Sequence, residues 1–236
     1  MSQNEVNKKY TKGKQKNLFS PVIAMVLFVA AAVVTYILFS NSLGNPIDQD
    51  ADMRAIGQEI RQALEGEQGE EVADINGNKY YERDLDVIIA NLKIYKTFQK
   101  MTEEQQRQQA GDELILQELY LLEFDRLGLE VTEEEFNENV DSMRTQMQEE
   151  IANETASAAQ FQQYLEGMGL TFSQYWQDEY TRIALRNDLK TQKVREYICT
   201  EIEGLSSVND NAVLSYLSGL IADGTYHIVL FGEEYQ

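Results

Sequence analysis

Residues Leu127-Gly128-Leu129-Glu130-Val131-Thr132-Glu133-Glu134-Glu135 decide the fold, because they encode the end of one helix and the start of the next. Gly128 between two leucines is typical of a helix C-terminus, where a glycine takes the left-handed conformation and the flanking apolar residues meet. Thr132 followed three residues later by Glu135 is a capping pattern that begins a helix. The stretch therefore predicts two helices joined by a short turn.

The same signals recur on both sides of this stretch. Caps made of Ser or Thr with a Gln three residues later begin at Thr102, Ser157 and Thr171, and Gly169 repeats the glycine end. No proline follows Pro46, so long helices are allowed in the rest of the chain. With apolar residues at helical spacing, the predicted helices cover residues 53–64, 85–100, 102–127, 132–151, 157–168, 171–198 and 209–223.

Two short segments predict strands. Residues 72–75 and 79–81 flank Asn76-Gly77, a pair that supplies the positive φ angles of a tight hairpin turn. Residues 226–231 predict a strand with no sequential partner, which must pair with the hairpin or with another molecule. We therefore expect a mainly α fold with a small β-hairpin and a C-terminal strand, and the lone strand allows a homodimer by helix or strand exchange.

Leu18 to Phe39 form one apolar stretch, interrupted only by Ser20, Pro21 and Thr35. A span of about 20 apolar residues matches the ~30 Å hydrocarbon core of a bilayer. Lysines precede the stretch and no lysine or arginine follows it closely, so the N-terminus is expected in the cytoplasm. We predict a single-pass protein of the cell membrane with an extracytoplasmic C-terminal domain. The alternative is a signal peptide cleaved near residues 40–42, although signal h-regions are usually shorter, about 7–15 residues.

Charge and cysteine content limit the partners. The chain has 20 Lys and Arg against 40 Asp and Glu, and most of the lysine excess lies in residues 1–17. So acidic a surface repels phosphate backbones and anionic lipid headgroups, which disfavours nucleic acid as a partner. Cys199 is the only cysteine, so no internal disulfide forms. Exported proteins without disulfides are common in Gram-positive bacteria, and this is the expected setting.

These observations predict five segments. They are a cytoplasmic tail (1–17), a transmembrane anchor (18–39), a linker with a short amphipathic helix (40–71), a helical domain (72–204), and a terminal helix plus strand (205–236).

No group of residues in the sequence indicates a catalytic site. Glu133-Glu134-Glu135 at the first turn of a helix complements the helix dipole more simply than it forms a metal cluster. Asp48, Asp50, Asp52 and Glu59 have the spacing of a calcium loop, but Met53 stands where that loop needs a glycine. His227 is the only histidine, which excludes a multi-histidine metal site. The sequence therefore predicts no catalytic residue, no metal and no cofactor.

The order of these elements resembles the SurA/PrsA family of extracytoplasmic chaperones over about residues 72–198. The resemblance is carried by Ala73-Asp74-Ile75-Asn76-Gly77, the 127–135 stretch, Phe161-Gln162-Gln163-Tyr164-Leu165, Met168-Gly169-Leu170-Thr171 and the arginine-containing helix around Tyr180–Arg186. It implies a SurA-N-like helical bundle in 72–204 and binding of unfolded or secreted polypeptide clients.

Members of that family commonly carry a parvulin-type prolyl isomerase domain after this module. His227-Ile228-Val229-Leu230 resembles the first strand of such a domain, so 205–236 is read as its start. The rest of the isomerase is not in this sequence. Two interpretations stay open: a chaperone-only member, or the N-terminal part of a peptidyl-prolyl cis-trans isomerase.

Methionines and aromatic side chains are the expected client-binding residues. Thioethers adapt to varied partners, and Tyr and Trp bind peptides while tolerating water. A plain core role is the alternative for each of them. The predicted peptide-binding residues are Tyr95, Met143, Met147, Tyr164, Met168, Tyr175 and Trp176.

The leading hypothesis is a membrane-anchored extracytoplasmic chaperone that binds unfolded secreted polypeptides through an apolar groove without ATP. Besides the isomerase, a non-catalytic membrane-anchored scaffold for one fixed partner is a further alternative.

Overall fold

A computed structural model of the chain describes residues 51–235. The tail and the membrane span predicted from the sequence lie outside the described residues, as do Asp48 and Asp50. Within residues 51–235, every helix is too short or too polar to cross a membrane.

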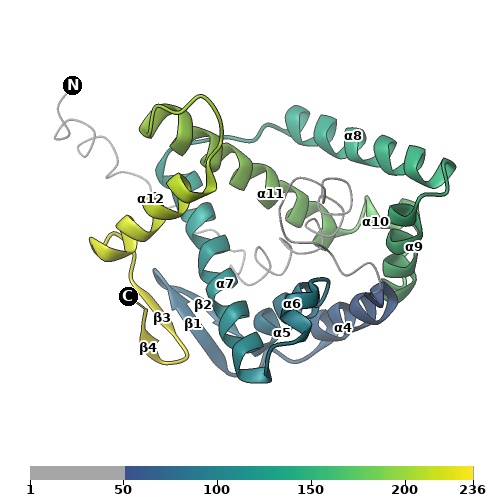
Figure 1. Cartoon of the computed structure of the whole chain (residues 1–236), viewed down its shortest axis with the longest axis horizontal. Coiled ribbons are helices and arrows are strands. Elements are labelled where there is room, and N and C mark those ends of the chain that lie inside the picture. Colours follow the sequence, from purple (N-terminus) through teal and green to yellow (C-terminus); the bar gives the residue numbers. More distant parts are fainter. Residues whose placement is uncertain (1–50, 236) are drawn as a thin grey trace.

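The described chain is mainly helical with one small antiparallel sheet (Figure 1), which confirms the mainly α fold. The helices are α4 (Met53–Glu65), α5 (Glu82–Leu92), α6 (Lys96–Gln99), α7 (Glu103–Arg126), α8 (Glu133–Ala152), α9 (Ala156–Met168), α10 (Phe172–Tyr175), α11 (Glu179–Tyr197), the π-helical turn η1 (Ile198–Ile202) and α12 (Asp210–Ala222). The strands are β1 (Glu71–Ile75), β2 (Asn78–Tyr81), β3 (Ile228–Leu230) and β4 (Glu233–Glu234).

The sheet has the strand order β2-β1-β3-β4, and all of its pairs are antiparallel. Asn76 and Gly77 form the predicted hairpin turn with φ angles of 53° and 88°. The C-terminal strand β3 pairs with β1, with Asp74 opposite Val229. The partners of β3 are therefore the hairpin of the same chain and β4, which follows β3 directly. The prediction that this strand has no sequential partner is wrong, and these pairings remove the observation that pointed to strand exchange.

The predicted helix ends around the 127–135 stretch are confirmed. Gly128 has a φ of 67°, and the N–H of Leu129 donates to the carbonyl of Phe124 at 3.1 Å. Thr132 begins α8, and its hydroxyl accepts from the N–H of Glu135 at 3.1 Å. The central helix α7 starts with the predicted capping box of Thr102.

Three helix boundaries differ from the prediction. The helix expected over 85–100 is two helices, α5 and α6, separated by a turn at residues 93–94 and by Tyr95, the N-cap of α6. α9 begins at the cap of Thr155 and not at Ser157. The long helix expected from Thr171 to Ile198 stops after one turn, because Asp178 begins α11 as a new N-cap.

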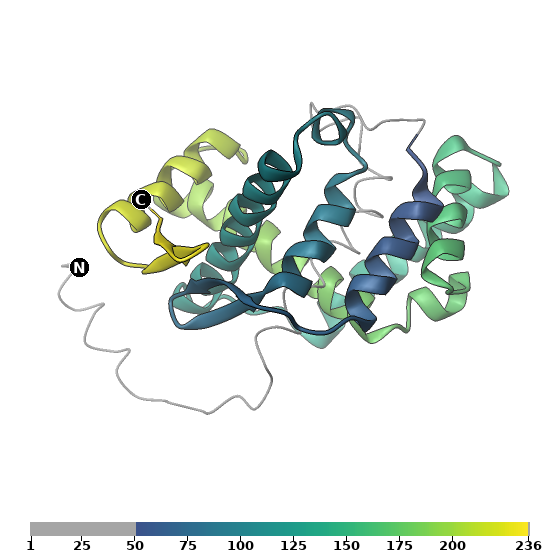
Figure 2. The ribbon, with the colours of Figure 1, turned by 90° about the horizontal axis from the view of Figure 1, so that it is seen from below.

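Helices distant in sequence lie side by side. Figure 2 shows α9, α4, α5 and α7 in a row, in that order, although α4 precedes the others in the chain. At the contact of α4 with α9, a Cβ on Gly57 would lie 2.5 Å from the carbonyl oxygen of Tyr164. A Cβ on Gly167 would lie 2.2 Å from that of Arg54. Only glycine allows the two backbones to approach so closely, so α4, predicted within a linker, packs tightly into the fold.

The apolar interior consists of two clusters. The first core gathers buried side chains of α4, α8, α9, α10 and the start of α11. The second core gathers those of the sheet, α7, the end of α11, η1 and α12. α5 contributes to both, with Val87 in the first core and Leu85 in the second, so it joins the two parts.

Candidate functional site

The seven predicted peptide-binding residues come together in one place, but below the surface. Six of them are buried in the first core, and Tyr95 is half-buried against it. The six are Met143, Met147, Tyr164, Met168, Tyr175 and Trp176, each at most 8% exposed. In this arrangement they are core residues, and their contact with clients stays a prediction.

The aromatic rings of this cluster pack edge to face. The ring of Tyr175 lies 5.2 Å from that of Phe161 and 5.2 Å from that of Trp176, with interplanar angles of 83° and 88°. This geometry is favourable for aromatic pairs. Burial raises the pKa of Tyr164 and of Tyr175 well above the ordinary value, so both phenols stay neutral. These side chains therefore form an uncharged aromatic cluster inside the first core.

Helix α8 packs on the aromatic cluster through a single stripe of buried side chains. Its buried residues are Phe136, Val140, Met143 and Met147, and most of its other residues are exposed.

The first turn of α8 is held to α11 by charge. Arg186 donates to Glu133 at 2.8 Å and lies 4.1 Å from the ring centre of Phe136, while Lys193 pairs with Glu135 at 2.7 Å. Two members of the acidic triplet therefore pair with cations of another helix, in addition to complementing the helix dipole.

A cleft of about 330 Å³ runs between α8 and the α10–α11 segment. Val140 and Trp176, both buried, and the half-buried Phe172 form its apolar part. Exposed polar side chains surround this part. They are Asn137, Asp141, Arg144 and Gln148 on α8, and Ser173 and Gln177 on the opposite wall. We call this feature the α8 cleft.

The polar wall of the α8 cleft is rich in groups that bond peptide backbones. Asn137 accepts from Arg182 at 3.2 Å, and Arg144 pairs with Asp141 at 3.1 Å. Side-chain amides both donate and accept hydrogen bonds, which lets them pair with N–H or C=O groups. The cleft therefore offers a small apolar surface framed by groups suited to an extended chain.

Trp176 is the predicted peptide-binding residue that lines the α8 cleft. Its side chain is 3% exposed, and its indole N–H has no hydrogen-bond partner among the described residues. A buried donor without a partner costs free energy. Because this nitrogen is covered, an acceptor of a ligand would reach it only after the surrounding side chains move.

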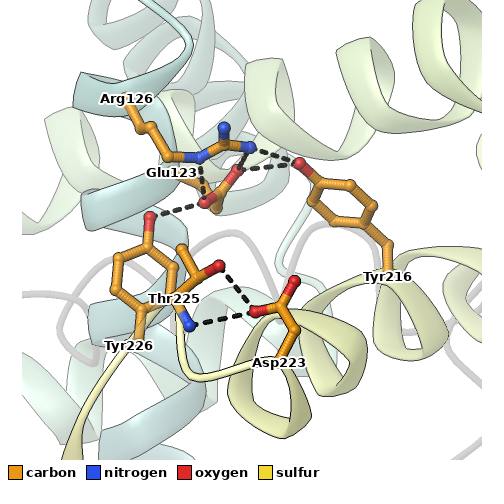
Figure 3. Close-up of polar contacts among 6 residues, drawn as sticks. All are labelled: Glu123, Arg126, Tyr216, Asp223, Thr225 and Tyr226. Atoms are coloured by element: carbon orange, nitrogen blue, oxygen red, sulfur yellow. Dashed lines mark hydrogen bonds and ion pairs between the residues drawn. The ribbon is translucent and has the colours of Figure 1, made fainter. Parts of the chain in front are cut away.

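The most connected polar cluster lies elsewhere, between α7, α12 and the segment before β3 (Figure 3). Glu123 is fully buried and accepts from Arg126 at 2.7 Å through each oxygen. The hydroxyls of Tyr226 and Tyr216 donate to it at 2.5 and 3.1 Å. With both oxygens engaged by donors, the carboxylate is suited to fastening α12 and β3 to α7 and not to binding a ligand.

The only histidine and the only cysteine of the chain lie in different surroundings. His227 is exposed and lies 3.8 Å from the carboxylate of Glu234, while Cys199 is buried beneath the α11–α12 connection. The backbone of His227 accepts from the N–H of Asn76, so its strand belongs to the hairpin sheet.

The sequence reasoning missed the polar wall of the α8 cleft. Residues 137, 141, 144 and 148 recur at helical spacing on one face of α8, directly beside the apolar stripe. That spacing was visible, but which exposed face borders a cleft depends on the position of α10.

Comparison with known proteins gives one match. A family model described as SurA-like N-terminal domain matches residues 14–195. No curated protein and no solved structure gives a match.

Proposed function

The chain belongs to the family of SurA-like N-terminal domains, and from this membership we propose a specific role. It is a chaperone anchored in the cell membrane by residues 18–39, which holds unfolded segments of secreted polypeptides outside the cytoplasm without using a nucleotide.

The observation that carries the proposal is the composition of the α8 cleft. Val140, Phe172 and Trp176 supply apolar surface for one or two client side chains. The amides around them bond to backbone groups, which every polypeptide has. Such a site would hold many sequences and would reject folded proteins, whose backbone groups are already paired.

The unpartnered indole N–H of Trp176 supports the same role. A backbone carbonyl of a client would satisfy this donor once a shift of α8 uncovers the nitrogen. The aromatic and methionine cluster behind Trp176 would extend the apolar surface if α8 shifts when a client binds.

The energy balance of client binding favours weak and reversible holding. A client that buried roughly 500 Å² of apolar surface would gain about 12 kcal/mol before costs, at ~25 cal/mol per Å². Lost translational freedom and ordering of the client consume most of that gain. Release then needs no nucleotide hydrolysis.

Filling the cleft tests the proposal. The full-length chain is incubated with several unrelated denatured proteins, and their aggregation is followed by light scattering without nucleotide. We expect protection by the natural sequence and at least fivefold weaker apparent affinity for Ser173→Trp, whose indole occupies the cleft. Ser142→Trp on the outer face of α8 is the matched control and should protect normally. Failure of the natural sequence to protect any client, or equal protection by both variants, contradicts the proposal.

The membrane topology needs a separate test. A cysteine placed at the exposed Glu130 should react with a membrane-impermeant maleimide in intact cells, whereas a cysteine at position 3 should not. Labelling of position 3 alone would reverse the proposed orientation.

A further inference from the structure

Exposed apolar side chains are concentrated between the end of η1 and the first half of α12. Among the described residues, five large apolar side chains are exposed, and all but Tyr180 lie within residues 202–214. These four are Ile202, Leu205, Val208 and Leu214, with exposed fractions of 42%, 37%, 45% and 44%. Isolated exposed apolar residues are ordinary, but a group of this kind marks an interaction surface. We call it the terminal patch.

The backbone holds the terminal patch outward. The N–H of Leu205 donates to the carbonyl of Cys199 at 2.7 Å, and the N–H of Asn209 donates to its sulfur at 3.2 Å. The connection is thus folded over the buried Cys199, and the apolar side chains that follow η1 are left exposed. π-helical turns such as η1 occur often at functional sites.

The surroundings of the patch are acidic. No lysine or arginine follows Arg195 in the sequence, and Arg195 is itself paired with Asp210. Glu201 and Glu203 are exposed and have no ion pair with a described residue. The patch therefore combines apolar contact surface with uncompensated negative charge.

We propose that the terminal patch docks a segment of a partner protein that carries apolar side chains flanked by lysines or arginines. A second copy of the chain would place acidic groups against acidic groups, and anionic lipid would be repelled in the same way. Figure 1 places α12 at the opposite end of the molecule from α9 and α10, so this surface is separate from the α8 cleft. The partner and a client can therefore bind at the same time.

Three synthetic peptides test this assignment on the full-length chain in nonionic detergent. The first is an amphipathic 14-residue peptide of leucine and lysine, the second has glutamate for lysine, and the third has serine for leucine. Fluorescence anisotropy should give micromolar binding for the first peptide and at least tenfold weaker binding for the other two. Raising sodium chloride from 50 to 500 mM should weaken the first peptide at least fivefold.

Variants locate the binding. Leu205→Ser/Val208→Ser keeps the net charge and should weaken the leucine–lysine peptide at least fivefold, as should Glu201→Lys/Glu203→Lys. Tyr180→Ser, which removes the exposed aromatic side chain outside the patch, should have no effect. Equal binding by the apolar double variant and the natural sequence would show attraction by net charge alone and would overturn the proposal. Dimers that dissociate on the Leu205→Ser/Val208→Ser change, seen by light scattering, would overturn it in favour of self-association.

Discussion

In the first core the closest approach is between two glycine-bearing backbones, whereas in the second core a buried carboxylate joins three elements. Gly57 and Gly167 bring α4 against α9, and Glu123 connects α7 to Tyr216 and Tyr226. The buried carboxylates of the described chain lie at the second core, since Asp84 and Glu118 are there as well. The first core therefore depends on close steric fit and the second core on a buried charge. Different substitutions should destabilise each of them.

The largest effect is expected in the second core. Arg126→Met leaves the fully buried Glu123 without its cationic partner, and removing one member of such a pair costs about 4 kcal/mol. Urea unfolding followed by circular dichroism gives the free energy, and hydrogen exchange should show faster opening of α12 and β3 than of α9.

A double variant separates charge from packing. Arg126→Met/Glu123→Leu leaves no buried charge and should recover a part of the lost stability. A double variant less stable than Arg126→Met would mean that the contacts of the two tyrosines, and not the charge, hold the second core together.

The first core should respond to a single methyl group. Gly167→Ala places a Cβ 2.2 Å from a backbone oxygen of α4, so the helices must separate, at a cost of about 3 kcal/mol. Gly219→Ala in α12 is the matched control, because its new Cβ would meet no atom within 4 Å beyond its chain neighbours and the backbone of its own helix. Helix propensity should make this control slightly more stable, by up to about 1 kcal/mol. Fluorescence of Trp176, the only tryptophan, reports unfolding of the first core. Equal stabilities for the two variants would refute close backbone packing.

The two cores should differ in how their stability depends on pH. Burial raises the pKa of Glu118 to about 7 and that of Asp84 to about 6. Because the folded state then binds more protons than the unfolded state, these groups stabilise the fold at pH 5, and that contribution is lost as the pH rises through their folded pKa values. We expect the free energy of unfolding to fall by about 2 kcal/mol between pH 5 and pH 8.

Replacing the acid removes the effect. Glu118→Gln should flatten most of this pH dependence, while Glu130→Gln at an exposed position should leave it unchanged. Hydrogen exchange, corrected for intrinsic rates, should change with pH near β2 and α7 and not in α9. A pH dependence that survives Glu118→Gln unchanged would assign it to other groups.

Local signals in the sequence were enough to predict most helix ends. The capping boxes of Thr102 and Thr171 and the left-handed Gly128 and Gly169 are formed by residues within a few positions of each other. Such contacts do not depend on the rest of the fold, and the Asn76-Gly77 turn is predictable for the same reason.

The site was harder to predict because burial depends on distant elements. The methionines and aromatic residues gather as one group, but only the position of α8 decides that they are covered. Glu123 lies on the apolar face of α7, and Tyr216 and Tyr226, its partners, are about 90 and 100 residues away in the sequence. The glycine contact of α4 with α9 likewise joins residues more than 100 positions apart.

The smallest effect on stability is expected at the break between α10 and α11, which the sequence did not predict. Apolar periodicity continues from Trp176 into α11, but the carboxylate of Asp178 accepts from the N–H of Thr181 at 2.9 Å and from its hydroxyl at 3.2 Å. These bonds start a new helix directly after Trp176, which lines the α8 cleft. Asp178→Ala should cost about 1 kcal/mol in urea unfolding, and Asp178→Asn, which keeps an acceptor, less than half of that. If Asp178→Ala has full stability and greater helicity, α10 and α11 form one continuous helix in solution. The α10–α11 side of the α8 cleft would then have a different shape from the one described.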